Sequence, residues 1–194
     1  NGGDIAMLSK FIKATRLKAS NLGWKVEVLC GESTKENIAI TCKYLINSAG
    51  LFAEQVAANI EGMSLDKIPK TRFTKGNYFS VSGSCPFKNL IYPLPEKGGL
   101  GTHLTLDLGG QALLGPDVEP LSINWLELTS NHSFDYSVEE DRKTKFYDGT
   151  IKWWPKLRFD QLKPAYSGIR PKINKIHEEP ADFIIETEEE NNIP

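Results

Sequence analysis

The sequence has few cysteines, no long apolar run and almost no net charge, and each shortage excludes a class of protein. Only three of its 194 residues are cysteines, and none forms a CxxC pair, so we expect reduced thiols, no disulfide framework and no metal site. The 23 basic and 25 acidic residues are mixed along the chain, which leaves no basic stripe for nucleic acid. The apolar runs fall far short of the roughly 20 residues that a membrane-spanning helix needs, so we expect no transmembrane segment.

The signatures of hydrolases and phosphotransferases are also missing. The sequence contains no Ser-His-Asp pattern and no P-loop, and residues 98–101 are not a dinucleotide fingerprint, because a strand rather than a helix is expected after them. The sequence does contain 40% hydrophobic and 10% aromatic residues, enough for one good-sized domain or two small lobes. It starts without methionine and ends in an acidic tract, so we expect an internal piece of a larger protein.

The first 61 residues contain both helical and strand-like spacing. Residues 5–20 carry apolar side chains at helical spacing and predict a helix. Strict alternation predicts a hairpin of strands over residues 24–30 and 38–42, which runs into a strand at 44–46 buried on both faces. A helix is predicted over residues 51–60.

Beyond Gly62 the pattern is typical of an antiparallel sheet, with short strand-like segments divided by glycine and proline. We expect strands over residues 72–81, 90–92, 100–108, 111–114 and 181–186, and a helix that begins near Ser137 and ends at Pro155. The predicted fold class is α+β.

Two segments contain side chains suited to acid–base or carboxylate chemistry. In the strand over residues 100–108, His103 lies on the polar face and is its only group that exchanges protons near neutral pH; a solvated outer face is the alternative. In Gly168-Ile169-Arg170-Pro171 the proline holds Arg170 extended, which suits a carboxylate clamp; a surface salt bridge is the alternative.

Two further segments have features of a binding site. Asn47-Ser48-Ala49-Gly50 precedes a helix whose free N–H groups suit an anion such as pyrophosphate, or it is simply a tight turn. Lys75-Gly76-Asn77-Tyr78 places a cation and a phenol at the entry to the sheet, where they could contact a ligand. The alternative is a snorkelling lysine and a half-buried tyrosine with a structural role only.

Taken in order, six segments resemble the FAD-dependent oxidoreductases of the D-amino-acid oxidase fold, and within them the branch that acts on L-2-hydroxyglutarate. The segments are Ile46-Asn47-Ser48-Ala49-Gly50-Leu51, Lys75-Gly76-Asn77-Tyr78-Phe79, Leu90-Ile91-Tyr92-Pro93-Leu94-Pro95, Gly98-Gly99-Leu100-Gly101-Thr102-His103-Leu104-Thr105-Leu106-Asp107, Leu114-Gly115-Pro116-Asp117 and Pro164-Ala165-Tyr166-Ser167-Gly168-Ile169-Arg170-Pro171-Lys172. The resemblance covers residues 46–185.

The resemblance implies an antiparallel-sheet substrate domain attached to an incomplete FAD-binding α/β lobe. Residues 1–61 would form part of the FAD lobe, residues 62–164 the substrate domain, and residues 165–194 the return to the FAD lobe. The GxGxxG segment and the closing flavin-contacting segment of the family are absent from this sequence. We therefore expect this piece neither to retain FAD nor to be active alone.

The resemblance also implies a function for the complete enzyme: oxidation of a 2-hydroxy acid, with L-2-hydroxyglutarate expected, by hydride transfer to FAD and onward to an unidentified electron acceptor. It implies Arg170 as the carboxylate clamp and His103 as the base. The remaining implied contacts are Tyr78, Tyr92 and Lys75 to substrate, and Ala49, Gly50, Gly168 and Arg170 to the cofactor. A related flavin oxidase for amino acids or glycerol 3-phosphate, and a non-catalytic ligand-binding module, are the alternatives. The expected location is cytoplasmic or membrane-peripheral in a bacterium and mitochondrial in a eukaryote.

Overall fold

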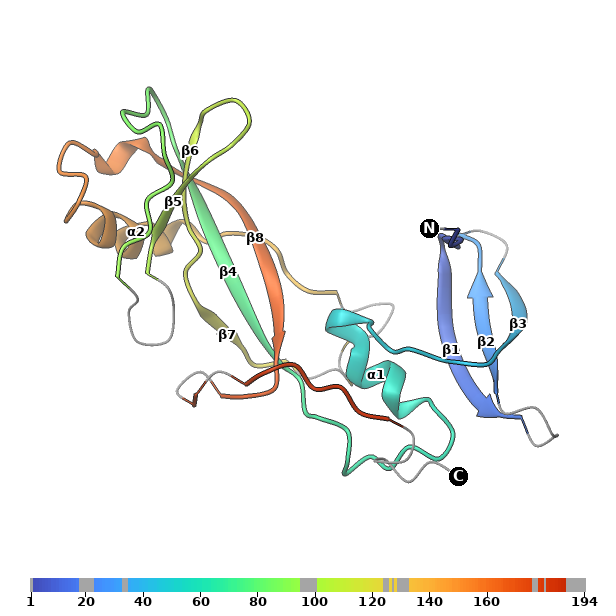
Figure 1. The fold of residues 1–194 in the computed structure, drawn as a ribbon. Helices are drawn as coiled ribbons and strands as arrows, with labels where there is room; N and C mark the ends of the chain where they lie inside the picture. The colour runs from blue at the N-terminus through green and yellow to red at the C-terminus, as the bar shows by residue number, and fades with distance from the viewer. Residues whose placement is uncertain are drawn as a thin grey trace. The chain divides into compact units, whose positions relative to one another are not determined.

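In the computed structural model shown in Figure 1, the chain divides into two units. The structure describes residues 2–17, 23–32, 35–94, 101–123, 126, 128, 133–175, 178–179 and 181–187. Unit 1 comprises residues 1–70 and 182–194, and unit 2 comprises residues 71–181. Each unit has its own antiparallel sheet and its own hydrophobic cluster, so the sheet-rich α+β class is confirmed. No helix in the described parts of the chain is long and apolar enough to cross a membrane.

Unit 1 is built on a three-stranded antiparallel sheet of β1 (Ser9–Arg16), β2 (Trp24–Cys30) and β3 (Glu36–Cys42), in that order. The predicted hairpin is confirmed as β2 and β3. The register places Val26 beside Ala14, and these side chains bury a small core with Trp24. The predicted second helix is present as the 3-10 turn η1 (Gly50–Phe52) followed by α1 (Ala53–Ala58).

The predicted helix over residues 5–20 is wrong, because residues 9–16 form strand β1. The β1–β2 register shifts between Phe11 and Lys13, so Ile12 is an extra residue in a bulge. The side chains that pair with β2 on the core face are therefore Phe11 and Ala14, three residues apart. A bulge of this kind gives a strand the apolar spacing of a helix.

Two other predicted strands are wrong. Residues 44–46 form no strand, and Tyr44 and Ile46 are exposed rather than buried on both faces. Residues 181–186 likewise form no strand. Both segments contain three consecutive apolar residues, but within the described residues neither has a paired neighbour to complete a backbone ladder.

Unit 2 is a five-stranded antiparallel sheet centred on β4 (Arg72–Val81), whose bounds match the prediction. One edge of β4 pairs with β6 (Ala112–Gly115) and with β7 (Glu119–Leu121), and β5 (His103–Leu106) pairs with β6 beyond it. The other edge pairs with β8 (Leu162–Lys172), so the two longest strands lie side by side (Figure 1). Strand β8 belongs to the sheet of unit 2, and residues 182–194 belong to unit 1. The division into an FAD lobe, a substrate domain and a return segment from residue 165 stays a prediction.

The core of unit 2 lies between the sheet and a short helical segment, η3 (Glu140–Arg142) continued by α2 (Lys143–Thr150). The predicted helix began near Ser137 and ended at Pro155, whereas the helical segment begins at Glu140 and ends at Thr150. Its Phe146 ring lies 4.7 Å from the Phe79 ring of β4, centroid to centroid, and both side chains are fully buried. The turn η4 (Phe159–Gln161) leads from the helix into β8. This core makes the sheet a rigid support for the side chains on its opposite face.

Candidate functional site

The side chains of β4 alternate between two faces of the sheet in unit 2. Gly76 and Tyr78 share one face, and Lys75 and Asn77 share the other. Directly paired residues of neighbouring strands lie on the same face, and β8 pairs Gly168 with Gly76. We call the face that carries Gly76, Tyr78 and their neighbours on the adjoining strands the open face, because the hydrophobic core lies on the other face.

Arg170 lies on the open face, opposite Thr74, and its guanidinium turns back over Gly76. A Cβ on Gly76 would lie 2.8 Å from Nη2 of Arg170 and 2.9 Å from the Cβ of Pro116. Any side chain at position 76 would therefore displace the guanidinium. Arg170 remains exposed, so its donors are accessible to an anion.

Tyr78 stacks on Tyr166 beside this guanidinium, with ring centroids 4.6 Å apart and planes inclined by 18°. The β4–β8 register shifts between Asn77 and Phe79, which gives β8 the extra residue that brings Tyr166 against Tyr78. Burial, and then the neighbouring Tyr166, raise the pKa of Tyr78, whereas Arg170 acts in the opposite direction. The pKa of the Tyr78 phenol therefore depends on both Tyr166 and Arg170.

His103 joins the same face from β5. It pairs with Gly115 of β6, and the β6–β4 register, extended by one pair from Phe79 and Leu114, brings Gly115 beside Tyr78. A Cβ on Gly115 would lie 2.7 Å from Cδ1 of Tyr78, so this glycine leaves room for the phenol ring. Its φ of 143° is also a conformation that favours glycine. His103 of β5, Gly115 of β6, Tyr78 of β4 and Tyr166 of β8 therefore form one row across the open face.

The imidazole of His103 is buried, with 6% of the residue exposed, which excludes the solvated outer face considered above. Its ring lies 4.2 Å from that of Tyr92, centroid to centroid. The segment that carries Tyr92 is bound to β5 by hydrogen bonds between Ile91 and Leu104 in both directions. The structure thus brings His103 together with Tyr92, and Tyr78 together with Arg170, on one face of unit 2.

Lys75 lies on the opposite face of β4 from Tyr78. It is only 4% exposed, and its Nζ lies 3.7 Å from Oδ2 of Asp135. The structure does not bring its ammonium to the open face. A contact between Lys75 and substrate stays a prediction from the resemblance.

Ala49 and Gly50 belong to unit 1, where they begin the turn before α1. The Ala49 N–H donates to Oδ1 of Asn47 at 3.2 Å, and Asn47 Nδ2 donates to the Ala53 carbonyl at 2.8 Å. Gly50 has a φ of 57°, which favours glycine. These bonds explain the segment as a tight turn, and its contact with a cofactor stays a prediction.

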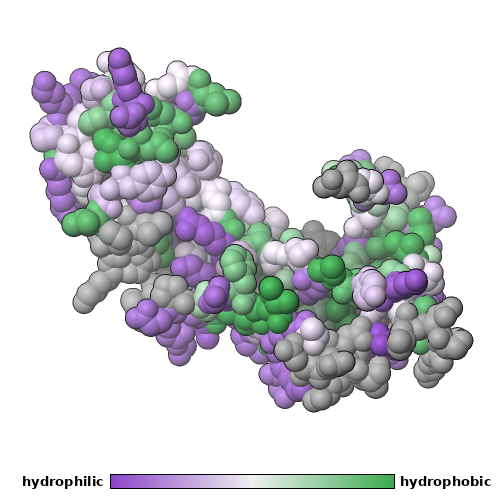
Figure 2. Space-filling view, viewed as in Figure 1, coloured by the Kyte–Doolittle hydropathy of each residue, from purple (hydrophilic) through white to green (hydrophobic). Residues whose placement is uncertain are grey.

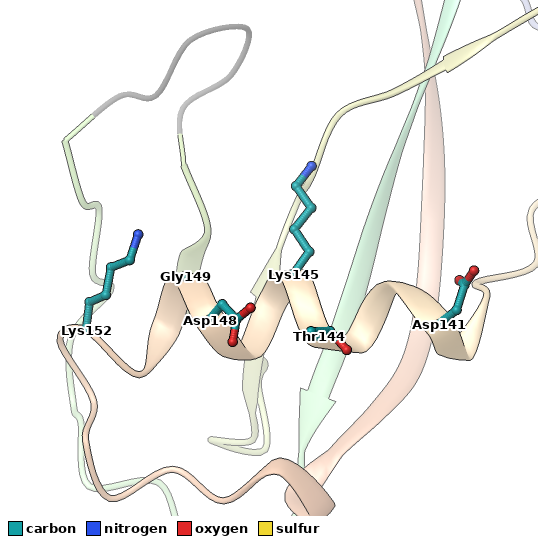
Figure 3. A pocket seen from close by; sticks show the side chains of 6 residues that line it. All are labelled: Asp141, Thr144, Lys145, Asp148, Gly149 and Lys152. Atoms are coloured by element: carbon teal, nitrogen blue, oxygen red, sulfur yellow. The ribbon is translucent and has the colours of Figure 1, made fainter.

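A separate hollow lies along the outer side of the α2 segment (Figure 3). Its lining combines acidic, basic and hydroxyl side chains: Asp141, Thr144, Lys145, Asp148, Gly149 and Lys152. None of the predicted site residues contributes to it. Among the described residues, no group of three His, Cys, Asp or Glu side chains is placed to hold a metal ion.

The sequence reasoning missed Tyr166 and the two glycines at positions 76 and 115. Tyr166, Gly168 and Arg170 alternate with period two, which is the spacing of one strand face. Pro164 and Pro171 lie within β8 and obscured that strand. The requirement for glycine at positions 76 and 115 comes from neighbours far away in the sequence, so no local signal marks it.

The open face of this antiparallel sheet thus combines an accessible arginine, a buried histidine and two stacked tyrosines, side chains whose chemistry suits a small anionic molecule. The family model "FAD dependent oxidoreductase" (DAO) matches residues 10–193, and the chain belongs to this family.

The chain is 43% identical to L-2-hydroxyglutarate dehydrogenase, mitochondrial, of Arabidopsis thaliana, over 77% of the chain and 32% of that protein. It is 27% identical to a glycerol 3-phosphate dehydrogenase of Caloramator mitchellensis, over 74% of the chain and 27% of that protein. The chain thus spans between about a quarter and a third of the length of these relatives. Its fold is similar to that of L-alpha-glycerophosphate oxidase of Mycoplasma pneumoniae with FAD bound, with a TM-score of 0.59 and 16% identity over 84% of the chain and 38% of that structure.

Proposed function

We propose that this chain is part of a flavin-dependent enzyme that oxidises a 2-hydroxy acid, with L-2-hydroxyglutarate as the substrate. Membership of the FAD-dependent oxidoreductase family and the 43% identity to an L-2-hydroxyglutarate dehydrogenase support this proposal. The observation that carries it is the Arg170 guanidinium over Gly76, beside the stacked Tyr78 and Tyr166. An exposed guanidinium next to flat aromatic surface suits a small carboxylate.

Oxidation of a 2-hydroxy acid removes a hydride from carbon and a proton from the hydroxyl group. FAD, when bound, accepts the hydride. The planar fork of Arg170 donates two parallel hydrogen bonds to the carboxylate and so orients the substrate. The imidazole of His103 takes the hydroxyl proton, and the Tyr92 ring packed against it restricts its orientation.

The open face also has room for a planar ring. A Cβ on Gly168 would meet no atom within 4 Å, and Gly168 pairs with Gly76, so bare backbone is accessible between Tyr166 and Arg170. Close approach of a flat group to backbone requires such positions. We therefore propose that Gly168 and Arg170 lie against the flavin in the complete enzyme.

The location and the electron acceptor follow from the same proposal. The Arabidopsis relative is named as mitochondrial, and we propose a mitochondrial location if the protein is eukaryotic and a cytoplasmic or membrane-peripheral one if it is bacterial. The enzyme would pass its electrons to an acceptor of unidentified chemistry.

The test uses the full-length protein and the substitutions Arg170→Ala and Arg170→Lys. For Arg170→Ala we expect kcat/KM for L-2-hydroxyglutarate to fall. The decrease corresponds to a loss of about 2–5 kcal/mol of transition-state stabilisation, as when one partner of a close charge pair is removed. Absorbance at 450 nm is expected to show that FAD is retained. The matched control is Arg158→Ala, because Arg158 forms an exposed ion pair with Asp160. Unchanged kinetics for Arg170→Ala would remove this arginine from the site.

Glycerol 3-phosphate is the second candidate substrate, because a relative bears that name and a guanidinium also binds phosphate. Bleaching of the flavin in the full-length protein by a panel of substrates separates the two. Bleaching by L-2-hydroxyglutarate supports the main proposal, and bleaching by glycerol 3-phosphate alone contradicts it. Oxidation of amino acids and non-catalytic ligand binding are less favoured, and the same panel tests both.

A further inference from the structure

A buried polar network lies directly beneath the open face. Its centre is Asn77, which stands between Gly76 and Tyr78 on β4 and points to the opposite side of the sheet. The backbone N–H and the Nδ2 of Asn77 both donate to Oδ1 of Asp117, each at 2.9 Å. Both side chains are buried.

Arg142 completes the network from η3. Its Nε donates to Oδ2 of Asp117 at 2.8 Å, and its Nη2 donates to the same oxygen. The Oε2 atom of Glu119 lies 3.3 Å from Nη1 of Arg142. The same oxygen accepts a hydrogen bond from Nδ2 of Asn77 at 2.8 Å. Each oxygen of the buried Asp117 carboxylate thus receives two donors, which is the condition under which a buried charge is tolerated.

The network fixes the backbone on which the open face is built. The Asp117 N–H donates to the Asn77 carbonyl at 3.2 Å, so Asp117 holds Asn77 through both backbone groups and through the side chain. The two residues before Asp117 are Pro116, beside Gly76, and Gly115, beneath the Tyr78 ring. A shift of this segment therefore moves the surface on which the Arg170 guanidinium and the Tyr78 phenol lie.

We propose that Asn77, Asp117 and Arg142 are positioning residues that hold Gly76 and Tyr78 in place and thereby align Arg170 and Tyr78 for the substrate. The catalytic consequence rests on the proposed function, whereas the effect on the Tyr78 ring does not. A displacement of about 1 Å costs on the order of 100-fold in rate when groups must be aligned for reaction. A network that served stability alone would leave the open face unchanged.

The substitution Asp117→Asn keeps the shape of the side chain but turns one of its amide donors toward the donors of Asn77 or Arg142. In the full-length protein, at a temperature where it remains folded, we expect kcat/KM to fall about 10- to 100-fold. With 3-fluorotyrosine incorporated, we expect the Tyr78 signal in the fluorine spectrum to shift; Tyr78→Phe assigns that signal. The matched control is Glu140→Gln, which removes the 3.1 Å ion pair to Lys143 in the same helical segment and leaves β4 untouched. We expect it to change neither readout.

A lower melting temperature for Asp117→Asn, with an unchanged Tyr78 signal, would show a purely structural network and overturn the proposal. If Asp117→Asn does not fold, Arg142→Lys tests the same point, since it keeps the charge but loses the forked hydrogen bonds to Asp117. The fluorine signal needs no turnover. A shifted Tyr78 signal in a protein that oxidises no 2-hydroxy acid would therefore support the positioning network and contradict the proposed function.

Discussion

The pKa of Tyr78 lies above the ordinary value of 10, because the phenol is partly buried and because Tyr166 lies beside it. The folded state then holds the phenol proton more tightly than the unfolded state does. The stabilising contribution is complete below pH 10 and is lost as the pH rises through the folded pKa. We expect the free energy of unfolding of the wild type to fall more steeply above pH 10 than that of Tyr78→Phe. Denaturant titrations between pH 9 and pH 11.5 measure this, and parallel pH profiles would contradict it.

A substitution at Gly168 distinguishes a role in FAD binding from a role in stability. A methyl group at this position meets no atom within 4 Å, and the residue has no positive φ, so Gly168→Ala should leave the free energy of unfolding within about 0.5 kcal/mol of the wild type. If the flavin lies against this backbone, the same methyl group intrudes on it at a cost of about 1–3 kcal/mol. We expect FAD titrated into the full-length apoprotein to bind roughly tenfold more weakly or worse. Unaltered FAD affinity would place the flavin elsewhere.

At the scale of elements, the short strand β6 depends on one glycine. A Cβ on Gly115 would lie 2.7 Å from the carbonyl oxygen of Asn77 and 2.7 Å from the Tyr78 ring, and the φ of 143° adds strain. We expect Gly115→Ala to lower the free energy of unfolding by about 1–3 kcal/mol, measured by denaturant titration. The control is Gly110→Ala, which also has a positive φ but leaves its Cβ in open space. Equal losses for the two would show that the close contacts at Gly115 are unimportant.

The sequence predicted the elements whose side-chain pattern is regular. Strand β4 was bounded correctly because glycine and proline lie close to both ends of a strand-like segment. Strict alternation predicted the β2–β3 hairpin, although β3 begins at Glu36 rather than at residue 38. Strand β1 was predicted as a helix because the bulge at Ile12 moves the inward positions to three residues apart. A bulge is defined by the neighbouring strand, so it could not be recognised from β1 alone.

The site could be predicted residue by residue but not as an arrangement. Arg170 and His103 were singled out from their local sequence, yet their place on a common face depends on the registers of β8 on β4 and of β5 on β6. The position of Lys75 was predictable, since residues three apart in a regular strand, such as Lys75 and Tyr78, lie on opposite faces. The partner of Lys75, Asp135, comes from a distant loop that no pattern identifies.

At the scale of the whole molecule, the two hydrophobic clusters share no residue. The cluster of Ala14, Trp24 and Val26 lies within unit 1, and the cluster around Phe79 and Phe146 lies within unit 2. In unit 1, β3 leaves Ile38 and Ile40 exposed. Figure 2 shows hydrophobic surface in the region of this three-stranded sheet. Unit 1 therefore buries less of its apolar sheet than unit 2 does, and we expect it to have the lower local stability.

Separate clusters predict separate responses to core substitutions. Phe146→Ala removes a fully buried ring that packs on Phe79 and should cost about 3–5 kcal/mol, whereas Trp24→Ala removes the centre of the smaller cluster. Hydrogen exchange of the full-length protein, followed by mass spectrometry of its peptides, locates each effect. We expect Phe146→Ala to speed exchange in β4, β5 and β6 and to spare β2, and Trp24→Ala to do the reverse.

The double variant completes this test. If the two clusters unfold separately, neither substitution changes the local stability of the other unit, so we expect each peptide of the double variant to follow its own single variant. Faster exchange in β2 upon Phe146→Ala would mean that the two clusters unfold as one cooperative unit. The open face would then depend on the core of unit 1 as well as on the sheet that carries it. If the effects stay separate, the alignment of Arg170, Tyr78 and His103 is a property of unit 2 alone, set by β4 and the strands paired with it.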